Sequence, residues 1–351
     1  MGSRDRNQPK RRSGRLGGRR VGRRPKRRRL RTLLLAWALA LLPVVSAVGV
    51  LTADRFASLV SSRWAWLADM TATLAAQALV VGVLAVVVSV VARRLAAAVV
   101  SLAAVLVLGV ALLDVPRAER SSDPEGPVVT VLAFNAWSTG TRGADQLEML
   151  LETDADLVML NEASDSLLAE LRTDPRVTSA YPHYRLPDRA GPGYRLVLSK
   201  HPFTRGEAAF GFVWPEIEAA LGRHGMRVVR VELPEGPMVF AGVQFRSPRS
   251  AARWAAGNTQ AAETAAGLSM IADVTRLPIV VAGDLNASPL GVRSRRFAEA
   301  SGLVRAKPAL RIGGTYPASL PGLARVPIDG ALVSPEIRLV SYRVVDAPGS
   351  D

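Results

Sequence analysis

The chain has 351 residues, a formal net charge of +15 and no cysteine. The absence of cysteine excludes disulfide bonds, a thiolate nucleophile and cysteine-ligated metal sites. Residues 1–31 carry 13 Arg and 2 Lys against one acid, Asp5, and therefore hold +14 of the net charge. The rest of the chain is nearly neutral, which argues against tight nucleic-acid binding by the folded part.

The basic segment 1–31 is rich in Arg and Gly and has almost no apolar residues. Such a composition cannot form a core, so we expect a disordered tail. Because it directly precedes an apolar segment, its expected partners are anionic lipid headgroups. A nucleic-acid-binding arm is the alternative.

Three apolar runs follow, at about 32–52, 71–92 and 95–113. Each has about the 20 residues that a helix needs to cross a bilayer, so we predict three transmembrane helices. The alternatives are buried helices of a soluble core and, for the first run, a cleaved signal peptide. Val, Leu and Ala on every face, and two further runs after the first, favour membrane anchors.

The distribution of Lys and Arg between the runs predicts their orientation. The tail and the tight Arg93-Arg94 turn are basic, whereas the expected loop 53–69 has two arginines balanced by Asp54 and Asp69. Basic flanks stay in the cytoplasm. We therefore expect a multi-pass protein of the cytoplasmic membrane with a cytoplasmic N-terminus and an extracytoplasmic C-terminal domain.

Residues 114–127 are polar and contain Pro and Gly, as a linker does, and residues 128–347 alternate apolar strands with helices. The helices are expected at 143–151 and 250–272. Strands are expected at 128–134, 157–160, 195–199, 226–233, 238–245, 278–283 and 326–334. Some of these strands follow one another without a helix, which favours mixed sheets in an α/β domain.

Polar residues stand at or near the ends of these strands. They are Asn135, Asn161, Glu162, Asp284, Asn286 and Asp329. Any one of them taken alone is best read as a turn or helix cap. Taken together, carboxylate and amide oxygens at strand ends suit a hard cation such as Mg²⁺.

The motifs around these residues carry a resemblance. Phe-Asn-Ala (134–136), Asp-Leu-Val-Met-Leu-Asn-Glu (156–162), Leu-Val-Leu-Ser-Lys-His-Pro (196–202), Gly-Asp-Leu-Asn (283–286) and Ile-Asp (328–329) occur in this order. The chain thereby resembles the endonuclease/exonuclease/phosphatase superfamily, which includes DNase I. The resemblance implies a four-layer α/β sandwich and phosphoester cleavage with Mg²⁺ or Mn²⁺.

Carried over residue by residue, the resemblance implies that Glu162 and Asn135 bind the metal. Asp284 would orient or deprotonate the attacking water, and Asn286 would hold that water or a phosphate oxygen. Asp329 would be the acid that supports a neighbouring histidine. These roles agree with general metal-assisted hydrolysis.

Two departures from the family pattern concern histidines. Gln244 and Gly330 stand where relatives usually have an imidazole. Loss of such a transition-state donor typically lowers the rate by about 10²- to 10³-fold. Of the three histidines present, His201 and His183 are expected to be structural or at the surface, and His224 solvated. Arg195, Arg246 and Arg249 are alternative phosphate contacts.

The prediction from the sequence is therefore a membrane-anchored, metal-dependent phosphoric-ester hydrolase. Its substrate is open between a lipid headgroup, a nucleotide and a nucleic acid. The alternative is a non-catalytic relative that binds a phosphorylated ligand or a protein partner, because both histidines are replaced at Gln244 and Gly330.

Overall fold

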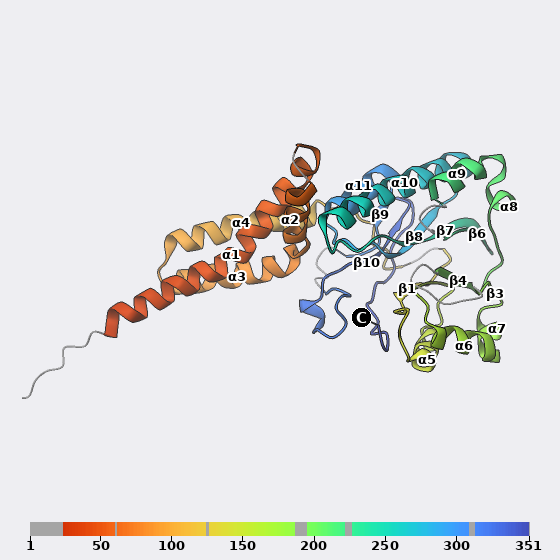
Figure 1. Cartoon of the computed structure of the whole chain (residues 1–351), viewed down its shortest axis with the longest axis horizontal. Coiled ribbons are helices and arrows are strands. Elements are labelled where there is room, and N and C mark those ends of the chain that lie inside the picture. Colours follow the sequence, from red (N-terminus) through yellow and green to blue (C-terminus); the bar gives the residue numbers. More distant parts are fainter. Residues whose placement is uncertain are drawn as a thin grey trace, which may run out of the picture.

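The structure is a computed structural model that describes residues 24–59, 62–123, 126–186, 195–221, 227–308 and 313–350. The predictions for most of the basic tail and for His224 lie outside these residues. An elongated helical bundle joins an α/β sandwich at one end, so the chain forms two parts in contact (Figure 1).

The bundle contains α1 (Arg24–Leu59), α2 (Ser62–Thr73), α3 (Ala75–Val91) and α4 (Leu95–Leu113). Among the described residues, two helical stretches are long and apolar enough to cross a membrane, Leu30–Ala57 and Leu95–Leu113. A third span exists if α2 and α3, which meet at a 62° bend, are counted as one. The structure is thus consistent with two or three membrane spans.

Two details of the predicted bundle are wrong. The described residues of the expected loop 53–69 are helical, and the expected span 71–92 is interrupted at Leu74, after which α3 begins. The hydroxyls of Thr71 and Thr73 donate to the carbonyl oxygens of Ala68 (2.8 Å) and Asp69 (2.9 Å). Such bonds compete with the backbone ladder and favour a bend at the end of α2.

The described residues of the sandwich form two mixed sheets. The first has the strand order β1 (Val131–Asn135), β2 (Leu157–Asn161), β4 (Arg195–Ser199) and β3 (His183–Tyr184). The second has the order β5 (Phe203–Thr204), β6 (Arg227–Leu233), β7 (Gly236–Gln244), β8 (Ile279–Asp284), β10 (Asp329–Val333) and β9 (Val304–Arg305). β1 pairs with β2 and β7 with β8 in parallel, and the other pairs are antiparallel. The predicted strand 326–334 is shorter than expected and begins only at Asp329.

Helices cover the outer faces of both sheets, as Figure 1 shows. α5 (Gly143–Thr153), α6 (Asp165–Thr173) and α7 (Pro175–Ala180) pack on the first sheet. On the second lie α8 (Glu207–Phe210), the 3₁₀ turn Gly211–Val213, α9 (Trp214–Leu221), α10 (Ala251–Thr275) and α11 (Val292–Ser301). Alternate strand residues such as Met159, Phe240 and Val280 fill the space between the sheets. The predicted four-layer α/β sandwich is confirmed.

The predicted linker packs on the sandwich where it is described. The backbone N–H of Ala118 donates to the Arg305 carbonyl at 2.9 Å, and the Arg305 N–H donates to the Pro116 carbonyl at 3.0 Å. Ala118 is buried in the core between the sheets. The segment that follows α4 therefore runs alongside β9, the edge strand of the second sheet.

Helix α2 fastens the bundle to the sandwich. The buried Asp69 carboxylate accepts the Val292 N–H at 2.8 Å and the Trp254 indole N–H at 2.7 Å. The Trp66 indole N–H donates to the Pro248 carbonyl at 2.7 Å. Val292 is the first residue of α11, so Asp69 caps this helix from another part of the chain.

We expect Asp69→Ala to loosen this contact by roughly 2 kcal/mol, because two hydrogen bonds to a buried carboxylate are lost. Exchange of the Val292 amide hydrogen should become about 30-fold faster, measured by hydrogen–deuterium exchange on the full-length protein. The matched control is Asp54→Ala, which removes a more exposed carboxylate paired with Arg295 and Arg296. Equal exchange of the Val292 amide in both variants would contradict the capping role.

Candidate active site

Six polar residues form two short rows at the ends of the strands. In the first sheet, Asn161 lies between Asn135 and Arg195 in the strand register. In the second sheet, Asp284 lies between Gln244 and Asp329. Neighbours within a row are about 5 Å apart, the spacing of paired strands.

The alternation of strand residues places both rows in the space between the sheets. In β8, Val280 and Ala282 belong to the core between the sheets, and Asp284 is the next residue on that face. The same two-residue step leads from Met159 to Asn161 and, in the opposite chain direction, from Val197 to Arg195. Each row therefore lies at the end of the apolar face that its sheet turns toward the other sheet. The two rows face each other across the space between the sheets.

Hydrogen bonds join the two rows. The Asn161 side-chain amide donates to the Val243 carbonyl at 3.2 Å, and an Arg195 Nη donates to the Gln244 carbonyl at 2.9 Å. The Gln244 amide donates to the Glu162 carboxylate. Glu162 follows β2 with a left-handed backbone (φ 53°), which turns its side chain toward the second sheet. The predicted metal ligand and one of the two substituted histidine positions are thus in direct contact.

Asp284 is the most enclosed carboxylate of the site, with 5% of its surface exposed. Its two oxygens accept the backbone N–H of Asn286 at 2.8 Å and the side-chain amide of Asn286 at 2.7 Å. The same amide also donates to the Phe245 carbonyl at 2.9 Å. Asn286 therefore holds Asp284 in one orientation, a role that the sequence did not predict. Its predicted contact to water or phosphate stays a prediction.

Asn135 and Asp329 flank the centre of the site. The Asn135 side-chain oxygen accepts the N–H of Trp137 at 3.0 Å, which fixes the turn after β1. Asp329 pairs with Asp284 across the strands, and its backbone N–H donates to the Thr315 hydroxyl at 3.3 Å. The structure thus brings the predicted residues to one edge of the sandwich.

Arg195 supplies positive charge within electrostatic range of Glu162 and Asp284. Burial lowers the pKa of Arg195 to about 10, with a further lowering from Arg227, while Glu162 and Asp284 act in the opposite direction. It therefore stays a cation at neutral pH. From the sequence, Arg195 is only one of three arginines that are alternative phosphate contacts. The feature that distinguishes it from the other two is its position at the start of a strand, on the buried face. Arg246 and Arg249, the other two, are exposed.

A side chain at position 330 would point in a different direction from the side chain of Gln244. A Cβ atom at Gly330 would lie 3.4 Å from Arg305 Nη1 and 3.9 Å from Leu285 Cδ1. Leu285 belongs to the core between the second sheet and its helices. A side chain at position 330 would therefore leave on that face, and Asp284 lies on the opposite one.

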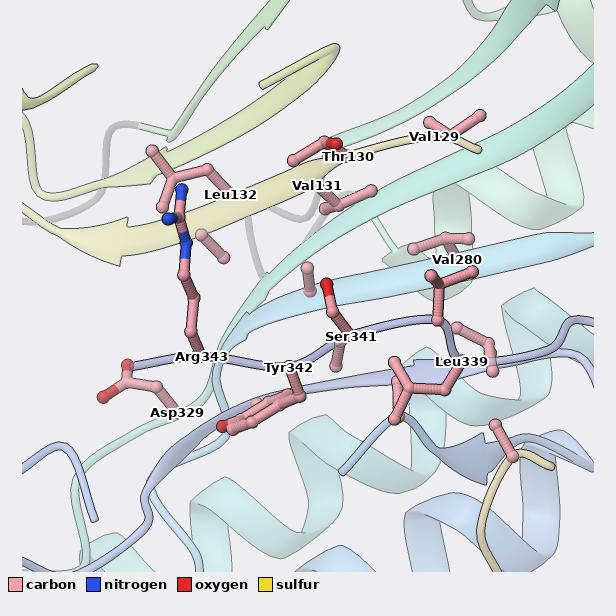
Figure 2. A pocket seen from close by; sticks show the side chains of 18 of the residues that line it. Val129, Thr130, Val131, Leu132, Val280, Asp329, Leu339, Ser341, Tyr342 and Arg343 are labelled. Carbon is pink, nitrogen blue, oxygen red and sulfur yellow. The ribbon is translucent and has the colours of Figure 1, made fainter. Parts of the chain in front are cut away.

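A cavity of about 850 Å³ opens beside the rows. It lies between β1, β8, β10 and the C-terminal segment, and its lining includes Asn135, Asp284 and Asp329. Figure 2 shows apolar side chains such as Val131 and Val280 along its walls, with the Arg343 side chain extending toward β1. Asp284 and Asp329 thus adjoin a space that can receive a ligand.

The donor set suits a hard divalent cation. Within the ranges that the structure describes, no three acidic or histidine side chains converge on one point. Mg²⁺ needs only one or two carboxylates, since water and substrate oxygens complete its shell. The buried amide oxygens Asn161 Oδ1 and Gln244 Oε1 accept no hydrogen bond from the described part of the chain, and the Gln244 amide is bonded to the Glu162 carboxylate. The residues present therefore fit an oxygen-coordinated cation.

Arg293 supports the site and was missed in the sequence. It is fully buried, and its Nη1 donates to the carbonyls of Arg246 (2.9 Å), Leu285 (3.2 Å) and Asn286 (3.2 Å). Its Nε donates to Asn258 Oδ1 at 3.2 Å. This one side chain ties together the segments that follow β7 and β8. An arginine in an amphipathic helix gives no sequence signal for such a role.

The two described histidines lie elsewhere. His201 closes a turn in which its N–H donates to the Ser199 hydroxyl at 2.9 Å and its carbonyl accepts from that hydroxyl at 2.7 Å. His183 lies on β3, at the far edge of the first sheet from β1. The expected structural role of His201 agrees with this geometry.

No match was found among curated protein sequences. Among solved structures, sphingomyelinase C from Streptomyces griseocarneus is 16% identical, with a TM-score of 0.43, covering 60% of this chain and 84% of that one. A Staphylococcus aureus beta toxin with bound magnesium ions is 13% identical, with a TM-score of 0.41, covering 59% and 84%. The human Nocturnin catalytic domain with bound sulfate is 17% identical, with a TM-score of 0.39, covering 59% and 82%.

The family model covers the sandwich as a whole. It matches residues 132–351, which include β1 from its second residue, every later strand to β10 and both rows of polar residues. With this match and the four-layer fold, the chain belongs to the Endonuclease/Exonuclease/phosphatase family.

Proposed function

We propose that the protein is a membrane-anchored phosphoesterase that depends on a divalent cation. The observation that carries this proposal is that Glu162, through its bond from Gln244, and Asp284, the register partner of Gln244, lie at one edge of the sandwich, with Arg195 in electrostatic range of both. A carboxylate that holds a cation, a second carboxylate that activates water and a fixed positive charge are the parts that phosphoester hydrolysis requires.

Each residue has a defined task in this proposal. Glu162 and Asn135 would hold Mg²⁺ or Mn²⁺, which when bound would polarise a phosphoryl oxygen. Asp284 accepts the proton of the attacking water, and the two N–H groups of Asn286 keep its carboxylate aligned. Arg195 offsets the negative charge that develops on the phosphoryl oxygens.

Turnover by this protein is expected to be slow compared with that of family members that have both histidines. The Gln244 amide replaces one imidazole and is already hydrogen-bonded to Glu162. At position 330 no side chain reaches the Asp284 face. Loss of the imidazole donor at position 244 alone is expected to lower the rate by about 10²- to 10³-fold.

The bundle supports the membrane part of the proposal. Its apolar helices are long enough for two or three spans. With three spans, the basic tail and the Arg93-Arg94 turn would lie in the cytoplasm and the sandwich would lie on the extracytoplasmic side.

The test is hydrolysis of bis-p-nitrophenyl phosphate by the full-length protein in detergent, with Mg²⁺, with Mn²⁺ and with EDTA. We expect turnover with either metal, none with EDTA, and a loss of about 10²-fold or more in Glu162→Gln. The matched control is Glu263→Gln on α10, outside the site. Turnover that survives both EDTA and Glu162→Gln would refute the proposal, and metal-dependent ligand binding without turnover would favour the non-catalytic alternative.

A further inference from the structure

Segments that border the site also contact the membrane helices. Leu290, six residues after Asp284, is buried in one apolar cluster with Ala75, Ala78 and Leu108 of α3 and α4. Six residues span at most about 20 Å even when fully extended. The Asp284 carboxylate is therefore held within about that distance of the bundle.

A second segment, residues 313–328, here called the wall loop, makes the same connection. The Thr315 hydroxyl accepts the Asp329 N–H at 3.3 Å, and Tyr316 and Arg325 line the cavity beside the site. Gln77, in the first turn of α3, donates from its side chain to the Arg325 carbonyl at 2.7 Å. The wall loop thus touches both the strand that carries Asp329 and the end of a membrane helix.

A small cavity of about 40 Å³ marks where these elements meet. Its lining combines Thr73 and Leu112, at the ends of α2 and α4, with Leu290 and Pro327 from the two segments that border the site. Arg117 also lines it, just after the last turn of α4. The side of the sandwich that carries the site therefore faces the end of the bundle. The cationic side chain of Arg117 lies at the same end of the bundle.

The wall loop exposes apolar side chains at this level. Leu323 is 70% exposed, Leu320 42% and Tyr316 39%. The backbone beneath them is fixed, because Arg325 donates to the carbonyls of Leu320 (2.6 Å) and Ala318 (2.7 Å). Leucines held outward beside the end of a membrane helix are suited to the boundary between headgroups and acyl chains.

We propose that the wall loop lies in the headgroup layer and that the substrate is the phosphoester headgroup of a membrane lipid, which enters the site from the bilayer. This inference rests on the proposed phosphoesterase function and adds its substrate class. The near-neutral charge of the chain outside residues 1–31 agrees with it, since long polyanions normally require clustered basic residues.

The first test measures the depth of the wall loop. Because the chain has no cysteine, Leu323→Cys and Phe212→Cys each give a single labelling site for a nitroxide. Phe212 is 88% exposed and follows α8, which lies at the end of the sandwich away from the bundle (Figure 1). In full-length protein reconstituted in equimolar phosphatidylglycerol and phosphatidylethanolamine, the label at 323 should be relaxed by oxygen and the label at 212 by an aqueous nickel complex. Aqueous relaxation at both positions would overturn the inference.

The second test measures the substrate class in the same vesicles. We expect release of phosphate-containing headgroups, followed by ³¹P NMR, and a decrease of about tenfold in the Leu320→Ser/Leu323→Ser double variant. Hydrolysis of bis-p-nitrophenyl phosphate should be unchanged in that variant, and Phe212→Ser should leave both rates unchanged.

The outcomes separate the two proposals. Hydrolysis of bis-p-nitrophenyl phosphate without lipid hydrolysis, or a preference for single-stranded DNA or RNA, would overturn the lipid inference and leave the phosphoesterase in place. Lipid hydrolysis that is unchanged in the Leu320→Ser/Leu323→Ser variant would overturn the proposal that the lipid headgroup enters the site along the wall loop. Failure with every substrate would remove the phosphoesterase proposal, and the lipid inference with it.

Discussion

Asp284→Asn is expected to lower kcat for bis-p-nitrophenyl phosphate by about 10²- to 10⁴-fold, the usual contribution of a positioned general base. The amide has the same shape as the carboxylate and keeps one acceptor, for the backbone N–H of Asn286 at 2.8 Å, but loses the acceptor for the Asn286 side-chain amide at 2.7 Å. It cannot take a proton from water. The main loss should therefore appear in kcat, with little change in KM and a loss of stability of only about 1 kcal/mol for the one hydrogen bond.

The control for this substitution is Asp273→Asn, which removes an exposed carboxylate on α10. Its kcat should equal that of the wild type. If Asp284→Asn retained full kcat, Asp284 would not be the base, and the arrangement with Asn286 would be structural only. A large drop in melting temperature would likewise assign Asp284 to folding.

Arg293→Met is expected to cause the largest loss of stability, about 3 kcal/mol. The methionine fills part of the volume but leaves the carbonyls of Arg246, Leu285 and Asn286 without the donor that the structure gives them. Each buried acceptor that loses its donor costs about 1–3 kcal/mol, partly recovered by relaxation and water. Urea unfolding of the full-length protein in detergent, followed by near-ultraviolet circular dichroism, measures the change.

Arg296→Met on the same helix is the matched control. Its guanidinium is half-exposed and pairs with Asp54 at 3.2 Å, so its removal should change stability by less than about 1 kcal/mol. Arg293→Lys should recover only part of the loss, because an ammonium cannot donate in the directions of the guanidinium fork. Equal stability of the two methionine variants would show that the Arg293 contacts contribute nothing net.

Much of the fold could be predicted because its signals are local. Short apolar runs located β1, β2, β4, β7 and β8 to within a few residues, and the run 195–199 matches β4 in full. The ends of these runs identified Asn135, Glu162, Asp284 and Asp329 as polar residues at or near strand ends. A continuous apolar run likewise defines α4, since its 19 residues need no partner to be recognised as a span.

Other features depend on contacts between distant parts of the chain. The docking of α2 on the sandwich follows from Asp69 and Trp66, whose partners lie 185 and 182 residues away in the sequence. Nothing near either residue indicates Trp254 or Pro248 as its partner. The predicted loop 53–69 was wrong for this reason.

The polar residues at the ends of apolar strands could be found from the sequence alone, because an apolar run and the polar residue that ends it lie in one short segment. Which strands are neighbours, and in which register, is visible only in the folded chain. That register places Asp284 between Gln244 and Asp329, directs any side chain at Gly330 to the opposite face, and brings Arg195 to the carboxylates. Strand pairing is set by the packing of both sheets and their helices at once, and no short segment contains that information.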